Sequence, residues 1–430
     1  MTVRVDICAY DALDDGGGPY VWIQSMPLKL MEMGFDIRVN LFSWHSPEEG
    51  YAYRFLTERG VPVRTTIFSD AITNVRWLLK LAEANRPDVF VANLVVPAFY
   101  AASYLKSAGV ATVGILRSDD SFYHAIADKF VYSPNSYQLS TVVCVSKFLC
   151  QLVDERSGNS IPSFHIPSGT PIPYQRVTRP GIELKIAYVG RLVEEQKQAS
   201  LLTHALVRVV SEIGGVEVAM YGDGPARENV QRIIEEANSA NLHLMGYLPN
   251  AELKRRLLDT HVVVLLSDYE GSPTAIMEAM ACGCVPVCLD IRSGIPELVE
   301  DGVTGLLVKD RGQNFVSAIR RLKDSPDLWQ ELSNNARTRA ECHFSTDLCA
   351  TKWANLLASY KKDSIAPEPF FCPEIIKLPA TSVGFAHQDW RTPTGLVRLL
   401  SEIKWRYIRA RMFLGKVRRH LVAYIPSSYP

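Results

Sequence analysis

Two glutamates, Glu270 and Glu278, stand on either side of a Gly-Ser-Pro turn. A strand is predicted over His261–Leu266, before the turn, and a helix over Ala275–Cys282, after it. In parallel α/β sheets, ligands bind beyond the carboxyl ends of strands, where the first turn of a helix offers free N–H groups to an anion. Glu278 can bind two adjacent hydroxyls, such as those of a ribose, through its two oxygens. The segment therefore indicates a nucleotide-sugar site, although a lone glutamate is usually a capping or surface residue.

Phosphate chemistry also needs cations, and two follow another predicted strand, Leu184–Val189. Arg191 comes directly after Gly190, and Lys197 precedes a predicted helix. Both cations lie where a diphosphate would sit, and both can stabilise a leaving nucleoside diphosphate. Without other evidence, solvated charges beside Glu194 and Glu195 would explain them equally well.

A glycine-rich turn, Asp14-Asp15-Gly16-Gly17-Gly18, follows the first predicted strand. Such a turn lets the backbone approach a phosphate or a sugar closely. As a lone glycine run it is a weak signal, and it lacks the full dinucleotide-binding pattern.

The elements that must position these residues alternate between short apolar strands and helices, which predicts parallel sheets with helical crossovers. The alternation stops in the proline-rich stretch Pro171–Gly181 and then restarts. We therefore predict an α/β fold of two Rossmann-like, doubly wound domains, 1–172 and 184–345, facing a central cleft. The predicted strands are Val3–Ala9, Asp36–Leu41, Asp88–Asn93, Ala111–Leu116, Thr141–Val145, Ser163–Ile166, Leu184–Val189, Val216–Tyr221, Asn241–Met245, His261–Leu266, Val285–Asp290 and Gly305–Val308.

Three segments follow the second domain. A helix within 346–362 is expected to close that domain, and 363–392 is a linker or a wrapping segment. The tail, 393–430, is predicted to be a basic amphipathic helix. Two interpretations of this tail are open: it lies on an anionic membrane leaflet, or it packs on the first domain with its cations solvated.

The composition excludes several classes of protein. The formal net charge of the 430 residues is +0, so no overall field attracts nucleic acid. The 9 cysteines, an odd number lying partly in apolar runs, suggest buried thiols in a reducing compartment; a zinc site at Cys282, Cys284 and Cys288 lacks a fourth ligand. The chain shows neither a signal-peptide pattern nor a run of roughly 18 apolar residues. A cytoplasmic protein is expected, with peripheral contact to the inner membrane face if the tail binds lipid.

Four motifs, in this order and spacing, resemble family 4 of the retaining glycosyltransferases, whose fold is called GT-B. The resemblance is specific over about Leu184–Asp310 and looser over the first domain. The motifs are Val189-Gly190-Arg191-Leu192 with Lys197, Gly222-Asp223-Gly224-Pro225, Gly246-Tyr247-Leu248, and Glu270-Gly271-Ser272-Pro273 with Glu278.

The resemblance implies a role for each matching residue on the donor side. Arg191 and Lys197 correspond to the diphosphate-binding pair, Glu278 to the ribose ligand, and Glu270 to a contact of the donor sugar. Further donor contacts are implied for Gly16, Gly17, Gly190, Gly222, Gly246, Tyr247, Leu248, Gly271, Ser272, Pro273 and Thr274.

The acceptor side departs from the family pattern. Many relatives carry a functional histidine where this chain has Arg117-Ser118-Asp119-Asp120, with His124 a little later. Arg117, Asp119 and His124 are therefore candidates for acceptor or donor-sugar contacts. A helix N-cap by Ser118 or Asp119 explains the segment equally well. In Pro167-Ser168-Gly169, Ser replaces the Asn of the family's Pro-Asn-Gly.

The implied activity is metal-independent, cofactor-free transfer of a sugar from a nucleoside diphosphate to a hydroxyl, with retention at the anomeric carbon. The implied acceptor is a carbohydrate or a lipid-linked molecule. The implied context is the assembly of a polysaccharide, glycolipid or other surface glycan. Two other classes stay open: a nucleotide-sugar 2-epimerase-like isomerase and a non-catalytic GT-B relative. Intact Arg191, Lys197, Glu270 and Glu278 favour transfer.

Overall fold

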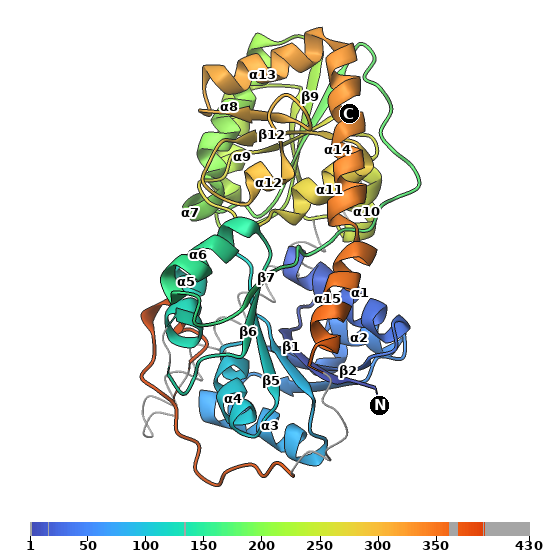
Figure 1. Cartoon of the computed structure of the whole chain (residues 1–430). Helices are drawn as coiled ribbons and strands as arrows, with labels where there is room; N and C mark the ends of the chain where they lie inside the picture. Colours follow the sequence, from blue (N-terminus) through green and yellow to red (C-terminus); the bar gives the residue numbers. More distant parts are fainter. Residues whose placement is uncertain (1, 16, 133–134, 361–368, 390, 392–430) are drawn as a thin grey trace.

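Two parallel sheets, each covered by helices on both faces, form the protein (Figure 1). The computed structural model describes residues 2–15, 17–132, 135–360, 369–389 and 391. The first sheet has seven strands in the order β3-β2-β1-β4-β5-β6-β7, and the second has six in the order β10-β9-β8-β11-β12-β13. Each packs its own hydrophobic core. The predicted α/β architecture of two doubly wound, Rossmann-like sheets is confirmed.

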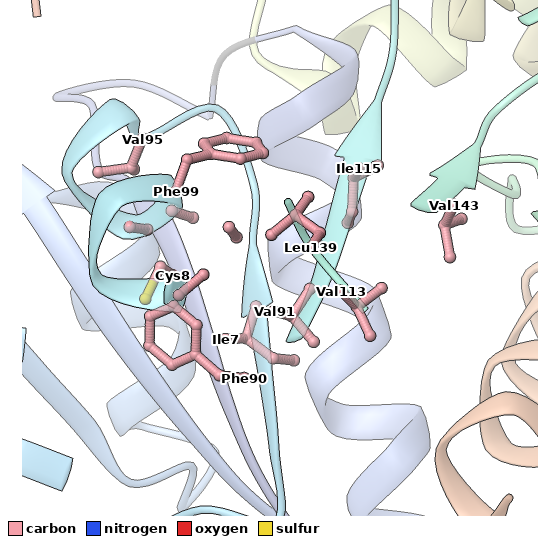
Figure 2. Packing of buried hydrophobic residues seen from close by; sticks show 14 of the residues in the cluster. Ile7, Cys8, Phe90, Val91, Val95, Phe99, Val113, Ile115, Leu139 and Val143 are labelled. Atoms are coloured by element: carbon pink, nitrogen blue, oxygen red, sulfur yellow. The ribbon is translucent and has the colours of Figure 1, made fainter. Parts of the chain in front are cut away.

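The first sheet is built from short apolar strands because both of its faces are buried. Figure 2 shows its centre, where Ile7, Val91 and Val113 pack beside Phe90 and Phe99. The strands are β1 (Arg4–Tyr10), β2 (Asp36–Ser43), β3 (Val63–Ile67), β4 (Val89–Ala92), β5 (Ala111–Leu116), β6 (Thr141–Cys144) and β7 (Ser163–His165). The helices are α1 (Gly18–Glu32), α2 (Tyr51–Thr57), α3 (Ala71–Ala84), α4 (Val96–Ser107), α5 (Ser121–Ala127) and α6 (Lys147–Ser157).

The second sheet places β8 between β9 and β11. Tyr188 of β8 is therefore in register with Val264 of β11, and the segments that follow these two strands emerge side by side. The strands are β8 (Leu184–Val189), β9 (Val216–Tyr221), β10 (Leu242–Gly246), β11 (Val262–Leu265), β12 (Val285–Leu289) and β13 (Leu306–Val308). The helices are α7 (Glu194–Lys197), α8 (Ala199–Glu212), α9 (Arg227–Ala237), α10 (Asn250–Leu257), α11 (Thr274–Cys282), α12 (Ile295–Leu298), α13 (Gln313–Asp324) and α14 (Pro326–Phe344).

Helix α15 (Thr346–Ala358) packs on the first domain, which corrects the expectation that it closes the second (Figure 1). Helix α14 ends at Phe344 in the second core. The chain then returns to the first domain beside the segment that links the two domains, where Thr170 and Ser345 form a parallel bridge. Trp353 of α15 is buried against Trp22 of α1, with ring centroids 5.6 Å apart. The apolar face of α15 is thus matched by α1, not by the second sheet.

Residues 369–389 wrap around the helices of the first domain. Phe385, in the short 3₁₀ helix η3 (Val383–Phe385), is fully buried in the first core. The Tyr100 hydroxyl donates to Asp389 at 2.7 Å, and the Val96 amide donates to the Gln388 side chain at 3.1 Å. The predicted basic tail, 393–430, lies outside the described residues. Within the described part of the chain, no helix is long and apolar enough to cross a membrane.

Candidate functional site

The centre of the predicted site is an ion pair between the ends of two neighbouring strands. The Lys197 ammonium contacts the Glu270 carboxylate, and their side chains are only 12% and 7% exposed. An ammonium held this deeply is strongly attracted to any anion that enters beside it, because surrounding protein screens charges less than water does. The structure therefore brings together two of the three residues predicted to be catalytic, and each neutralises the other.

Arg191, the third predicted residue, reaches the same place through a residue that the motifs did not reveal. Its guanidinium donates to the Gln196 side chain at 3.2 Å, and the Gln196 amide donates to the Tyr269 carbonyl at 3.1 Å. The Asp268 amide completes the link by donating to the Gln196 carbonyl at 2.9 Å. Gln196 thus ties the segment that carries both cations to the segment that carries Glu270. The only sequence signal for this residue was its place between the two cations.

Two helix N-termini meet at the end of the turn that begins with Glu270. Helix α1 starts after Gly17 and helix α11 after Pro273; neither has a side-chain cap or an acidic residue in its first turn. They touch closely, since a Cβ on Gly18 would overlap the Thr274 side chain. Unpaired N–H groups and the helix dipoles make such a junction favourable for an anion. Gly16, the other predicted glycine of this loop, lies outside the described residues.

Gly271 lies in close contact with the first domain. A Cβ at this position would overlap the carbonyl oxygen of Arg117 and lie 3.0 Å from the Ser118 Cα atom. The turn of Gly271, Ser272 and Pro273 therefore reaches the first domain only because its first residue has no side chain.

The Arg117 side chain points into the first domain. Its Nε atom donates to Asn93 at 2.8 Å and its Nη1 atom donates to the Ser168 hydroxyl at 3.0 Å, while the guanidinium lies 4.8 Å from the Trp22 ring centroid. Burial lowers the pKa of Arg117 to about 10. The part of this predicted acceptor-side residue that lies against Gly271 is its backbone carbonyl.

The other two acceptor-side candidates form a pair at the start of α5. His124 Nε2 lies 3.0 Å from the Asp119 carboxylate, and both side chains are partly exposed. The N-cap of α5 is Asp120, whose carboxylate accepts from the Tyr123 amide at 2.9 Å. The predicted cap at Ser118 or Asp119 is thus wrong by one or two positions, which leaves Asp119 available to His124.

Three glycines line the carboxyl ends of β8, β9 and β10. The Gly222 amide donates to the Gly246 carbonyl at 2.8 Å, and a Cβ on Gly222 would overlap the Gly190 carbonyl. Gly246 has a φ of +76°, a conformation that favours glycine. These glycines, with the partly buried Tyr247 and Leu248 that follow, lie where the resemblance implies nucleotide contacts.

Glu278 is a buried acid on the first turns of α11. Burial is the main cause that raises the pKa of Glu278 to about 7. The Asp15 charge also raises this pKa, and the Lys254 charge lowers it. A carboxyl whose pKa is raised in the folded state takes up a proton more readily there than in the unfolded chain. Stability is therefore highest below the unfolded pKa of 4.5 and falls as pH rises toward 7.

Glu278→Gln is expected to remove this pH dependence. The difference between pKa 4.5 and about 7 corresponds to about 3 kcal/mol, so the free energy of unfolding of the parent should fall by that order between pH 4.5 and 8. Urea unfolding at several pH values measures it, with the exposed Glu331→Gln as the control. If the free energy of unfolding changed with pH in the same way in the parent and in the Glu278→Gln variant, the raised pKa of Glu278 would be refuted.

A cavity of about 800 Å³ lies next to Asp14 and Asp15, which precede the glycines of the loop. It is lined by α1, α2 and α10, and by the hinge residues Pro171 and Ile172.

The described residues contain no group of three His, Cys, Asp or Glu side chains that could hold a metal ion. Metal independence stays a prediction.

The second domain is similar in sequence to known glycosyltransferases. Residues 175–339 match the family model "Glycosyl transferases group 1". The poly(ribitol-phosphate) alpha-N-acetylglucosaminyltransferase of Staphylococcus aureus is 29% identical over 176 residues, which are 40% of this chain and 35% of that protein. The amylovoran biosynthesis glycosyltransferase AmsK of Erwinia amylovora is 30% identical over 216 residues, 45% of this chain and 52% of AmsK. The matched region thus spans about half or less of these relatives.

Solved structures extend the likeness to both domains. The crystal structure of Anabaena HepE in complex with UDP and glucose superposes with a TM-score of 0.67 at 17% identity, covering 83% of this chain and all of HepE. A sucrose-phosphate synthase from Thermosynechococcus elongatus superposes with a TM-score of 0.66, also at 17% identity, over 83% of this chain and 98% of that one. The fold is therefore GT-B, as predicted.

Proposed function

We propose that this protein moves a sugar from a nucleoside diphosphate sugar to a hydroxyl acceptor, because residues 175–339 match the model of the group 1 glycosyl transferases. The observation that carries the proposal is the buried Lys197–Glu270 pair beside the junction of the α1 and α11 N-termini. A diphosphate entering this junction meets the ammonium, the Arg191 guanidinium and two sets of free N–H groups. The names of the relatives support assembly of a polysaccharide, glycolipid or other surface glycan as the context.

In the proposed complex, the diphosphate replaces Glu270 as the partner of Lys197. Glu270 then turns to the hydroxyls of the transferred sugar, and Glu278 binds the ribose diol. The segment from Gly246 to Leu248 is proposed to lie beside the base. HepE, which has the same fold, is described with UDP and glucose, which supports a donor of this kind.

We propose that transfer retains the configuration at the anomeric carbon. The bond from that carbon to the diphosphate oxygen breaks while the acceptor hydroxyl attacks from the same face, and the hydroxyl proton passes to the leaving phosphate oxygen. Lys197 and Arg191 stabilise the negative charge that grows on the diphosphate, which needs no metal ion. Asp119 and His124, at the cleft end of β5, are the proposed acceptor contacts.

We propose that the acceptor is a carbohydrate or a lipid-linked molecule. We also propose that the basic tail, 393–430, contacts the cytoplasmic face of a membrane. Between Arg398 and Arg419 the tail carries eight basic residues against Glu402 alone. Such a segment is attracted to anionic lipid. Co-sedimentation with anionic but not neutral liposomes, lost on truncation after Lys361, is the expected result; equal sedimentation of both forms would reject the membrane contact.

The donor is tested by thermal shift against UDP, GDP, ADP and dTDP. A nucleotide at a hundred times its Kd stabilises the folded protein by about 2.7 kcal/mol, so one base should stand out. Its nucleotide sugars are then incubated with and without an acceptor, and the anomeric configuration of the product is read by NMR. No stabilisation by any nucleotide would reject the donor site, and a new nucleotide sugar formed without acceptor would indicate an isomerase.

A further inference from the structure

Two carboxylates bridge the domains on opposite sides of the proposed donor site. We propose that Asp15, from the first domain, and Glu297, from the second, are positioning residues that hold the cleft closed for transfer. Each acts by accepting N–H groups at the start of a helix in the opposite domain. The inference rests on the proposed function for its effect on transfer, but the closing contact itself can be measured without any substrate.

Asp15 reaches the second domain from the glycine loop. Its carboxylate accepts from the Asn250 amide at 2.6 Å and from the Tyr247 hydroxyl, and its carbonyl accepts from the Asn250 side chain at 3.4 Å. Asn250 is the first residue of α10, whose own N-cap, Pro249, provides no side-chain acceptor. The second domain therefore receives the cap of this helix from the first domain, and Asp15 is 5% exposed as a result.

Glu297 makes the reciprocal contact from α12. Its two carboxylate oxygens accept from the Lys147 and Phe148 amides, both at 2.8 Å, at the start of α6. His165 Nε2 lies 3.7 Å from the same carboxylate, and burial lowers the His165 pKa to about 4, so that ring is neutral. The Arg292 guanidinium adds a contact 5.4 Å from the Phe148 ring centroid.

Each bridge adjoins a part of the donor site. Asp15 precedes the loop that starts α1, and its partner Tyr247 lies in the motif expected to face the base. On the other side, α12 follows Gly294, where a Cβ would overlap the Gly271 carbonyl and lie 2.9 Å from the Ser146 Cβ atom. Closing both bridges thus presses the Gly271 turn onto Arg117 and the α1 start onto Thr274. In that position the two domains exclude water from the diphosphate.

The two bridges have the chemistry of a reversible closure. Hydrogen bonds from N–H groups to a carboxylate are about twice as strong as neutral ones, yet both partners are well solvated when the domains part. Replacing either carboxylate by an amide exchanges one acceptor oxygen for an NH₂ group that faces an N–H donor. Asp15→Asn and Glu297→Gln are therefore nearly isosteric changes that weaken closure specifically.

The test compares Asp15→Asn and Glu297→Gln with Asp14→Asn and Glu300→Gln. The controls are exposed carboxylates in the same two segments; Asp14 makes no described hydrogen bond, and Glu300 pairs at 3.5 Å with Arg339 of its own domain. Small-angle scattering of the donor-free full chain measures domain separation. Both bridge variants should show a larger radius of gyration, and the double variant a larger one still, while the controls match the parent.

The second readout is the fate of the donor. Each bridge variant should raise KM for the donor roughly tenfold. The ratio of donor hydrolysis to sugar transfer should rise by a similar factor. Unchanged scattering and an unchanged ratio of hydrolysis to transfer in both variants would overturn the closing role. A parent protein that neither transfers nor hydrolyses any sugar nucleotide would instead count against the proposed function, and the scattering result would still decide the inference.

Discussion

Replacing Lys197 by methionine is expected to lower the rate of sugar transfer on the order of a thousandfold. The Lys197 ammonium is held by Glu270 with only 12% of its side chain exposed, and in the proposed mechanism it stabilises the charge that grows as the diphosphate leaves. Methionine keeps the length and apolar stem of the side chain but removes the charge. Initial rates with saturating donor and acceptor measure the loss, which should appear mainly in kcat.

The double variant Lys197→Met with Glu270→Gln separates chemistry from stability. Methionine alone leaves the buried Glu270 carboxylate without its cation, which costs about 3 kcal/mol. The added glutamine removes that charge, so the free energy of unfolding should recover while transfer stays lost. Lys185→Met is the matched control, because Lys185 pairs with Asp259 at 2.7 Å on the same domain but away from the cleft. Transfer at the parent rate in the Lys197 variant would refute the assignment.

Gly271→Ala is expected to lower transfer about a hundredfold with little loss of stability. The added methyl group would overlap the Arg117 carbonyl, so the second domain can fold normally only by standing farther from the first. A displacement of about 1 Å in an active site can cost a hundredfold in rate. Transfer assays and thermal unfolding of the same preparation give both quantities.

The control for this change is Gly214→Ala, in the same domain. A Cβ on Gly214 would meet no atom within 4 Å, so its activity should equal that of the parent. If Gly271→Ala kept full activity, the closed arrangement of the domains would not be the one in which transfer occurs. If it lost stability as much as activity, the clash would lie within the second domain.

Much of the frame around the proposed donor site was predictable because its strands are clear apolar runs. Leu184–Val189 and Val216–Tyr221 match the observed β8 and β9 residue for residue. Strand β3 (Val63–Ile67) was missed because it is an edge strand with Arg64, Thr65 and Thr66 in its centre, and none of its residues is buried. Its apolar pattern is therefore too weak to distinguish it from a loop.

What the sequence did not reveal depends on contacts between distant segments. Asp15 and Glu297 look like ordinary surface acids along the chain, and only the packing of two domains turns each into a helix cap. Helix α15 was assigned to the wrong domain because an apolar helical face does not specify its partner. Arg117, taken as a cleft residue from its position after β5, is drawn inward by Asn93 and Ser168.

The return of α15 to the first domain sets an order for folding during synthesis. The ribosome completes all seven strands of the first sheet by His165, but the helix that covers Trp22 with Trp353 is made only after the whole second domain. A nascent first domain therefore carries an open apolar face while the entire second domain is still being translated. We expect the second domain, whose core is continuous from Val177 to Phe344, to reach its native state first, and the first domain to be finished last. A cut between the two sheets would consequently yield one self-sufficient piece and one that needs its missing helix supplied in trans.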